Sequence, residues 1–392
     1  MTDHKTRDAL IRRIDAYLSA MLQLWATRGW DEARGGPHER LGPDHRPIEP
    51  GFRRLTVCAR QLFVFSRAEA CGLVEGARGL ADRAFRYLVE RFLDPVHGGF
   101  YFTVGPDGAP LDRTKDLYSH AFALLGLAEY LAMSDEPEAR GWLGETDGAA
   151  LRRFHLPQGW YAASAAADWS VRDGNLLQNP HMHLLEAYLA ADCATGDARY
   201  RDRASDLIGL MRTRLHEPQS GMIIEFRNEA GEPDHERGHI VEPGHLFEWC
   251  WLLHLASARL DQPACLQDAD GLFERACASG IDKQFGGVFD QVSIDGKLIA
   301  DTKRIWPVTE LIKAHAARYK ATRQTRELAA LCDAVEFLFR AYLLPDGGWR
   351  ERLRRDLTCY DDALPATTCY HILLGLREAR DALADGISSA AQ

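Results

Sequence analysis

Histidines and carboxylates recur in this sequence at a nearly constant interval. Starting from Arg60 and moving in intervals of 60 to 64 residues, the chain presents His120, His183, His245, Pro307 and His371. Three residues after three of these positions, and so one helical turn further on the same face, stand Glu186, Glu248 and Glu310. Imidazole exchanges protons near neutral pH, and a nearby carboxylate can orient it. The pattern predicts a site for proton transfer.

The position of these histidines at helix N-termini favours the neutral form of the imidazole. One histidine at the start of an apolar helix is usually structural, but four in register are difficult to explain as capping groups. The positive end of the helix dipole lowers the pKa of a nearby histidine. We therefore expect neutral imidazoles, the form that can abstract a proton.

A repeat of about 62 residues must position these groups. A glycine followed by an apolar residue or proline recurs six times, and four of the six have a second glycine directly before, at Gly35, Gly98, Gly286 and Gly347. Such pairs are typical of turns that need positive φ. Six units tile the chain, so we expect one domain over residues 1–392, although its length alone would suggest two or three.

Each unit has the same order of elements. Amphipathic stretches such as 7–28, 75–92, 198–215 and 327–343 predict surface helices. Segments such as GGFYFTVGPDGAPL and GGVFDQVSIDGKLI predict short hairpins. A more apolar helix follows, which predicts burial on all sides. Neither terminal unit looks like the polar cap of an open array, so we predict a closed all-α ring, an (α/α)6 barrel with β-hairpins in the loops at one end.

Composition excludes several classes of function. A net charge of -10 disfavours binding to a polyanion. No apolar run approaches the length of a membrane span, and the charged start of the chain lacks a signal core, so we expect a cytoplasmic protein. Nine cysteines without a CxxC pair predict reduced thiols. Phosphate-binding glycine loops are absent from the sequence, and we expect no cofactor.

Two motifs resemble metal sites. His235 to His239 matches HExxH, but it lies in a predicted hairpin region between two prolines and contains a glycine, whereas the zinc motif requires a helix. His181 and His183 are two residues apart at a helix start, where side chains diverge. We predict no metal at either place.

The chain resembles the N-acylglucosamine 2-epimerase superfamily. The resemblance is carried by ARQLFVFSRA (59–68), TKDLYSHAFALLGLAEY (114–130), NPHMHLLEAYLA (179–190), EPGHLFEWCWLL (242–253) and RIWPVTELIKA (304–314). These segments fall in five of the six units and so span essentially the whole chain. Members are (α/α)6 barrels, which agrees with the repeat. Two of the segments, NPHMHLLEA and PGHLFEW, are similar to the branch that contains mannose isomerases.

The resemblance implies a set of site residues. His245 and His371 would be the general acid and base, although the match around His371 is looser and rests on repeat position. The sugar pocket would be lined by Arg60, Tyr118, Asn179, His183, Glu248 and Trp306. Glu248 would orient His245 or bind a hydroxyl, while its alternative role is an interior ion pair. His120, His181 and Glu310 would support the site or satisfy helix ends.

We therefore expect an aldose–ketose isomerase that acts on an unphosphorylated monosaccharide, D-mannose to D-fructose, through a cis-enediolate. Its partner would be the sugar alone, with no nucleic acid and no membrane, and a homo-oligomer is compatible. A 2-epimerase on the same scaffold is the first alternative. A glycoside hydrolase, which needs paired carboxylates, and a non-catalytic sugar-binding protein are alternatives from other classes.

Overall fold

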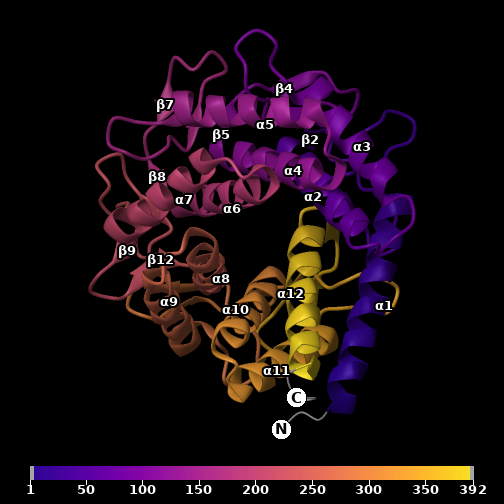
Figure 1. Ribbon diagram of the computed structural model, residues 1–392, viewed down its shortest axis with the longest axis vertical. Coiled ribbons are helices and arrows are strands. Elements are labelled where there is room, and N and C mark those ends of the chain that lie inside the picture. Colours follow the sequence, from indigo (N-terminus) through magenta and orange to yellow (C-terminus); the bar gives the residue numbers. More distant parts are fainter. Residues whose placement is uncertain (1–3, 389–392) are drawn as a thin grey trace.

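The computed structural model describes residues 4–388, whose twelve α-helices form a double-walled ring (Figure 1). The inner wall consists of α2 (Leu55–Ala70), α4 (Leu117–Ser134), α6 (Gln178–Thr195), α8 (Pro243–Leu260), α10 (Trp306–Thr322) and α12 (Thr368–Ser388). The outer wall consists of α1 (His4–Arg28), α3 (Ala77–Tyr87), α5 (Pro137–Ala149), α7 (Ala198–Leu210), α9 (Ala264–Gly280) and α11 (Thr325–Ala341). Three outer helices continue into π-helical turns, η1 (Leu88–Phe92), η2 (Ala150–Phe154) and η3 (Met211–Leu215).

The two ends of the chain close the ring. Each inner helix contacts the next, α12 contacts α2, and α1 packs against α12. Strand β1 (Arg40–Leu41) pairs antiparallel with β18 (Leu364–Pro365), which joins the first unit to the sixth. The predicted (α/α)6 barrel is confirmed, and the array is closed as expected.

Small residues allow the inner helices to pack closely. A Cβ atom on Gly126 of α4 would lie 2.7 Å from the carbonyl oxygen of Ala59 on α2, and one on Gly375 of α12 would lie 2.9 Å from the Thr309 side chain on α10. The inner helices are buried on nearly every side, whereas the outer helices bury one face. This difference follows from the apolar and amphipathic patterns of the two helix types.

Short strand pairs surround one end of the barrel. A two-residue strand precedes each inner helix and pairs antiparallel with a strand of the next unit. The pairs are β2 (Arg53–Arg54) with β3 (Thr103–Val104), β5 (Lys115–Asp116) with β6 (Ser164–Ala165), β8 (Leu176–Leu177) with β11 (Phe226–Arg227), β12 (Ile240–Val241) with β13 (Gln291–Ser293), β15 (Lys303–Arg304) with β16 (Arg352–Leu353), and β18 with β1. The inner helices therefore all begin at this end, the mouth of the barrel.

The remaining strands complete the loops at the mouth. They are β4 (Pro110–Asp112), β7 (Arg172–Asp173), β9 (His216–Glu217), β10 (Met222–Ile223), β14 (Leu298–Ala300) and β17 (Cys359–Asp361). The two segments predicted as hairpins form β3 with β4 and β13 with β14. The glycine that precedes each predicted Gly-apolar turn has positive φ at all four positions, for example 72° at Gly98.

Buried ion pairs fix the mouth loops to the barrel. Lys115 Nζ lies 2.8 Å from Asp94 Oδ2, and Lys303 Nζ lies 2.8 Å from Asp282 Oδ2 in the equivalent place three units later. Among the described cysteines there is no disulfide. Over the described residues, none of the helices has the length and apolar composition needed to cross a membrane.

Candidate active site

A cavity of about 710 Å³ opens at the mouth of the barrel. Its wall is built from the first turns of the inner helices and from the strands before them. All eight residues implied by the resemblance line it: Arg60, Tyr118, Asn179, His183, His245, Glu248, Trp306 and His371. The repeat thus brings together residues that are more than 300 positions apart in the chain.

His245 is held in its charged form by a neighbouring carboxylate. Glu225 Oε1 lies 2.9 Å from His245 Nδ1, and Gln178 Nε2 donates to Glu225 Oε2 at 2.7 Å. Burial by itself favours the neutral imidazole, but Glu225, Glu242 and Glu248 outweigh it and raise the pKa of His245 to about 9. The expectation of neutral histidines is wrong here, because the carboxylates have a larger effect than the helix dipole.

His371 is neutral, unlike His245. Its Nδ1 lies 2.8 Å from Glu310 Oε1, and its Nε2 lies 3.5 Å from Arg60 Nη1. Burial, with repulsion from Arg60 and Lys313, lowers the pKa of His371 well below the usual value. Because a guanidinium only donates, Nε2 accepts and the proton of the neutral ring belongs on Nδ1. Nε2 is therefore the unprotonated nitrogen, the one that can act as a base when a substrate displaces the long contact with Arg60.

The Trp306 ring packs against both imidazoles. Its ring centroid lies 4.8 Å from that of His245 and 5.7 Å from that of His371, with interplanar angles of 34° and 39°. Aromatic side chains in a polar cavity suit the apolar face of a pyranose. An acid and a base thus both lie next to an aromatic side chain that a sugar ring can contact.

Arg60 is fixed in orientation by its surroundings. Its Nη2 donates to the Tyr118 hydroxyl at 2.7 Å and its Nη1 donates to the Thr367 carbonyl at 3.1 Å, while Phe122 lies 4.0 Å from the guanidinium carbon. A fixed cation beside a base can stabilise an enediolate oxygen without reorganising during the reaction.

A buried charge network forms the floor of the cavity. Lys313 Nζ lies 2.5 Å from Glu310 Oε2 and 3.4 Å from Glu248 Oε1. Glu248 therefore does not hold His245, the first role considered for it, because Glu225 occupies that position. Glu248 instead forms the interior ion pair named as its alternative. Its second oxygen, Oε2, is buried and accepts no hydrogen bond from the described residues, as is also true of Asn179 Oδ1.

His120 does not reach the cavity, so the expectation of four histidines in one ring is wrong. Its Nδ1 contacts the Asp116 carbonyl oxygen at 2.7 Å and its Nε2 accepts from Phe100 N–H. His181 makes the same two contacts one unit later, with Leu177 and Tyr161. The structural equivalent of His120 is thus His181, two residues before His183, and both histidines satisfy helix-end and loop groups.

Several other aromatic residues belong to the core and do not line the cavity at the mouth. Trp349 is fully buried and stacks on Trp25 with a centroid separation of 6.1 Å. Phe100 packs against His120. Trp249 is buried and donates to Gln178 Oε1 at 2.8 Å. These contacts are core packing.

Sequence reasoning missed Glu225, Gln178, Lys313 and Glu351, which surround or line the site. Burial raises the pKa of Glu351 to about 7. A signal was present for two of them. Glu225 and Lys313 are the single charges within the apolar runs MIIEF and LIKA, and a buried charge in such a run needs a partner.

Two groups of buried side chains have ligand atoms close enough to surround a metal ion. One consists of His183, Glu186 and Glu248, and the other of Glu248, Glu310 and His371. The second group already holds a cation, because the Lys313 ammonium lies between its two carboxylates. In the first group, Glu186 accepts from the Tyr370 hydroxyl. These residues therefore fit an internal ion-pair network better than a metal centre.

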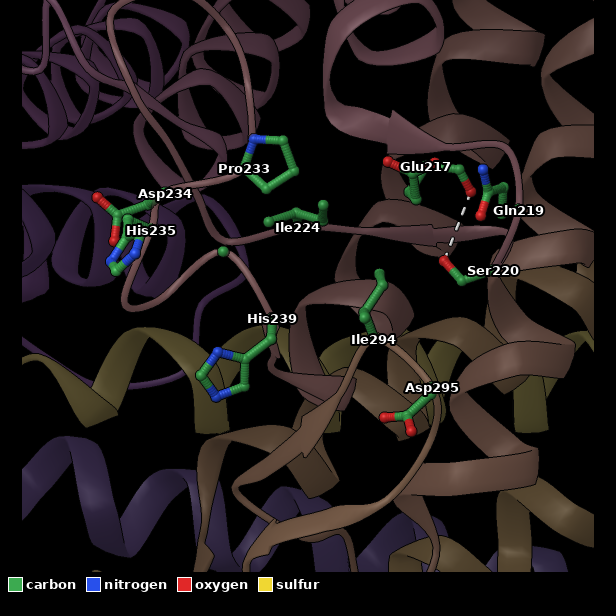
Figure 2. Close-up of a pocket in the computed structure, with 11 residues that line it drawn as sticks. Glu217, Gln219, Ser220, Ile224, Pro233, Asp234, His235, His239, Ile294 and Asp295 are labelled. Atoms are coloured by element: carbon green, nitrogen blue, oxygen red, sulfur yellow. Dashed lines mark hydrogen bonds between the residues drawn. The ribbon is translucent and has the colours of Figure 1, made fainter.

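The HExxH match lies in a different cavity, of about 580 Å³ (Figure 2). Residues 235–239 form a turn, not a helix, and His235 and His239 are both exposed. Within the described part of the chain, neither histidine belongs to a set of ligand atoms close enough to share a metal ion. The prediction that the HExxH residues do not lie on a helix is confirmed.

Comparison with known proteins decides the family. The model of the N-acylglucosamine 2-epimerase (GlcNAc 2-epimerase) family matches residues 35–375. The chain belongs to the N-acylglucosamine 2-epimerase family. This membership makes it an enzyme of the sugar isomerase and 2-epimerase type, as the resemblance implied.

Relatives of this member of the 2-epimerase family are named for different activities. A mannose-6-phosphate isomerase of Rhizobium meliloti (strain 1021) is 32% identical over 372 residues, which cover 93% of this chain and 95% of the relative. A cellobiose 2-epimerase of Bacteroides fragilis is 25% identical over 86% of this chain and 88% of its own length. A solved D-mannose isomerase superposes with a TM-score of 0.86 at 24% identity, covering 94% of this chain and 97% of that structure.

Proposed function

We propose that this enzyme interconverts D-mannose and D-fructose by moving a proton between C2 and C1 of the open-chain sugar. One observation carries the proposal: two imidazoles that both pack against Trp306 have environments that drive their pKa values apart, upward at His245 and downward at His371. Such a divergence identifies the acid and the base of a pair.

Each residue then has a role in the reaction. His245, protonated, donates to the ring oxygen and opens the pyranose. His371, neutral, removes the C2 proton through Nε2 and returns it to C1 of the cis-enediolate, while the hydroxyl proton of O2 passes to O1. Arg60 stabilises the charge that develops on O1 or O2. Asn179 Oδ1 and Glu248 Oε2, which lack donors among the described residues, accept from sugar hydroxyls, and Tyr118 and His183 complete the wall.

The charges of the wall favour an unphosphorylated sugar. Each of the four arginines in the wall is already bonded: Arg54 to Glu39, Arg60 to Tyr118, Arg304 to Glu242 and Asp290, and Arg352 to Asp361. A phosphate dianion would have to displace these partners and approach the carboxylates of Glu242 and Glu351. This argues against a phosphorylated substrate, although a relative is named for one.

A 2-epimerase is the second candidate, and the same residues support it. In that reaction the proton returns to C2 from the opposite face instead of to C1. A relative at 25% identity is named for such an activity on cellobiose, so the candidate deserves a direct comparison.

Incubation of the enzyme with D-mannose in deuterated water, followed by NMR, tests the proposal. Fructose as the first product supports it, whereas glucose as the first product favours 2-epimerisation. Absence of both products and of C2 exchange overturns both activities for this sugar. Parallel incubations with mannose 6-phosphate, N-acetylmannosamine and cellobiose distinguish the other substrate classes.

A further inference from the structure

A second cavity lies at the opposite end of the barrel from the mouth. It has a volume of about 460 Å³ and is lined by the C-terminal halves of α2, α4, α6, α8 and α12. Glu186 of α6 is part of this wall and is not among the residues that line the mouth cavity. We call this space the far-end cavity.

Buried titratable groups connect Glu186 to His371. Ligand atoms of Glu186 and Glu248 lie within 4.8 Å of one another, a gap that one water molecule can bridge. Lys313 Nζ lies 3.4 Å from Glu248 and 2.5 Å from Glu310, whose other oxygen lies 2.8 Å from His371 Nδ1. These five residues, Glu186, Glu248, Lys313, Glu310 and His371, form an axial network.

The axial network contains several titratable groups that can hold a proton and pass it on. Its three carboxylates share one ammonium group, and all of these side chains are buried, so full ionisation would leave excess negative charge in a medium of low dielectric constant. Burial accordingly raises the pKa of Glu186 and of Glu310. Within such a coupled set, protons belong to the network more than to one residue.

The proposed reaction supplies a reason for such a carrier. His371 accepts the C2 proton on Nε2 and becomes an imidazolium ion, flanked by Arg60 and Lys313. Nδ1 can then pass its own proton to Glu310, which leaves a neutral ring with the former C2 proton on Nε2. While a sugar fills the mouth, the other end of the axial network still meets the far-end cavity.

We propose that the axial network is a proton relay that connects Nδ1 of His371 with water in the far-end cavity. Its catalytic use rests on the proposed function, but the connection itself does not. Glu186 acts through the other groups and does not touch the sugar. Protons are conserved at each step: one enters Glu310 from Nδ1 as another leaves Glu186 for water, and the reverse sequence restores Nδ1.

Exchange of the imidazole proton tests the connection without any sugar. In protein labelled with ¹⁵N-histidine, NMR measures the rate at which the His371 Nδ1 proton exchanges with water. We expect Glu186→Gln to slow this exchange roughly tenfold, because it removes one proton carrier, and Glu186→Asp to retain it. Glu129→Gln is the matched control, since Glu129 lines the same cavity but pairs with Arg67. Equal rates in Glu186→Gln and the unmodified enzyme overturn the relay.

The rate of turnover tests the catalytic use. At saturating D-mannose we expect kcat to fall severalfold in Glu186→Gln, because the imidazolium ion formed on removal of the C2 proton can no longer pass its Nδ1 proton along the axial network, whereas Glu129→Gln should keep the kcat of the unmodified enzyme. A kcat unchanged in Glu186→Gln overturns the catalytic use. If no sugar is converted while imidazole exchange depends on Glu186, the proposed function fails and the relay stands.

Discussion

Glu225 Oε1 lies 2.9 Å from Nδ1 of His245, and this contact gives one histidine of the mouth a charge that the other lacks. The two residues come from different parts of one unit: Glu225 precedes β11, and His245 lies in the first turn of α8. Gln178 of α6 holds the carboxylate from the other side. The charge of His245 is thus set by a contact within one unit, and Gln178 of the neighbouring unit supports it.

Replacement of Glu225 by glutamine is expected to lower the pKa of His245 from about 9. The proposed mechanism requires protonated His245, so we expect activity to be lost as pH rises through this pKa. The basic limb of the kcat/KM profile should therefore move down by about one to two pH units in Glu225→Gln. Glu217→Gln, on the same hairpin, is the control and should leave the limb in place. An unmoved limb in Glu225→Gln would exclude His245 as the acid.

Loss of the base is expected to abolish both exchange and turnover. His371→Asn should lower kcat by about 10²- to 10⁴-fold, and deuterium exchange at C2 of mannose should fall in parallel. His239→Asn, at an exposed position that lines a different cavity, should behave as the unmodified enzyme. Exchange that persists in His371→Asn would show that another group removes the C2 proton.

The indole of Trp306 is expected to act mainly on binding. Trp306→Ala removes the aromatic surface next to the two imidazoles and should raise KM about tenfold, whereas Trp306→Phe should raise KM less. Steady-state kinetics with thermal unfolding as a fold check measures both. Trp142→Phe on the outer helix α5 is the control. A KM unchanged in Trp306→Ala would place the sugar elsewhere in the cavity.

Lys313 is expected to be essential for stability. Lys313→Met leaves Glu248 and Glu310 buried without their cation and should cost about 3 to 5 kcal/mol of unfolding free energy. Adding Glu248→Gln should recover part of that loss. Lys320 lies on the same helix as Lys313 and forms a partly exposed ion pair with Glu378 of α12. Lys320→Met breaks this pair and should cost less than about 1 kcal/mol of unfolding free energy. Similar losses for the two lysines in urea unfolding would contradict the network.

Acid is expected to destabilise the fold through its neutral core histidines. Burial lowers the pKa of His120 and His181 to about 4 in the folded state. The unfolded chain binds protons from about pH 6.5 downward, so stability falls below that pH, by up to about 1.4 kcal/mol per pH unit for each histidine. His181→Gln should reduce this slope in urea unfolding, and His235→Gln should not. His245 has the opposite sign: its contribution is present below about pH 6.5 and is lost as pH rises through about 9.

The periodicity of the sequence identified the barrel and most of its mouth. Apolar inner helices and amphipathic outer helices differ in composition, so their alternation is visible along the chain without any contact between units. Residues that face the mouth, such as His183 and His371, recur at the period because each starts an inner helix. The same reasoning made His120 the equivalent of His183, although its structural equivalent is His181. The error arises because the period locates equivalent residues only to within about half a helical turn.

Contacts between elements of the closed ring were decided only by the tertiary structure. Glu225 reaches His245 because β11 and α8 converge at the mouth, and Lys313 lies between Glu248 and Glu310 because α8 and α10 are neighbours in the ring. No spacing in the chain specifies these distances, yet they determine which imidazole is charged. The sequence by itself placed eight residues at the cavity, whereas burial and the partner of each charge, which exist only in the closed ring, decided their protonation.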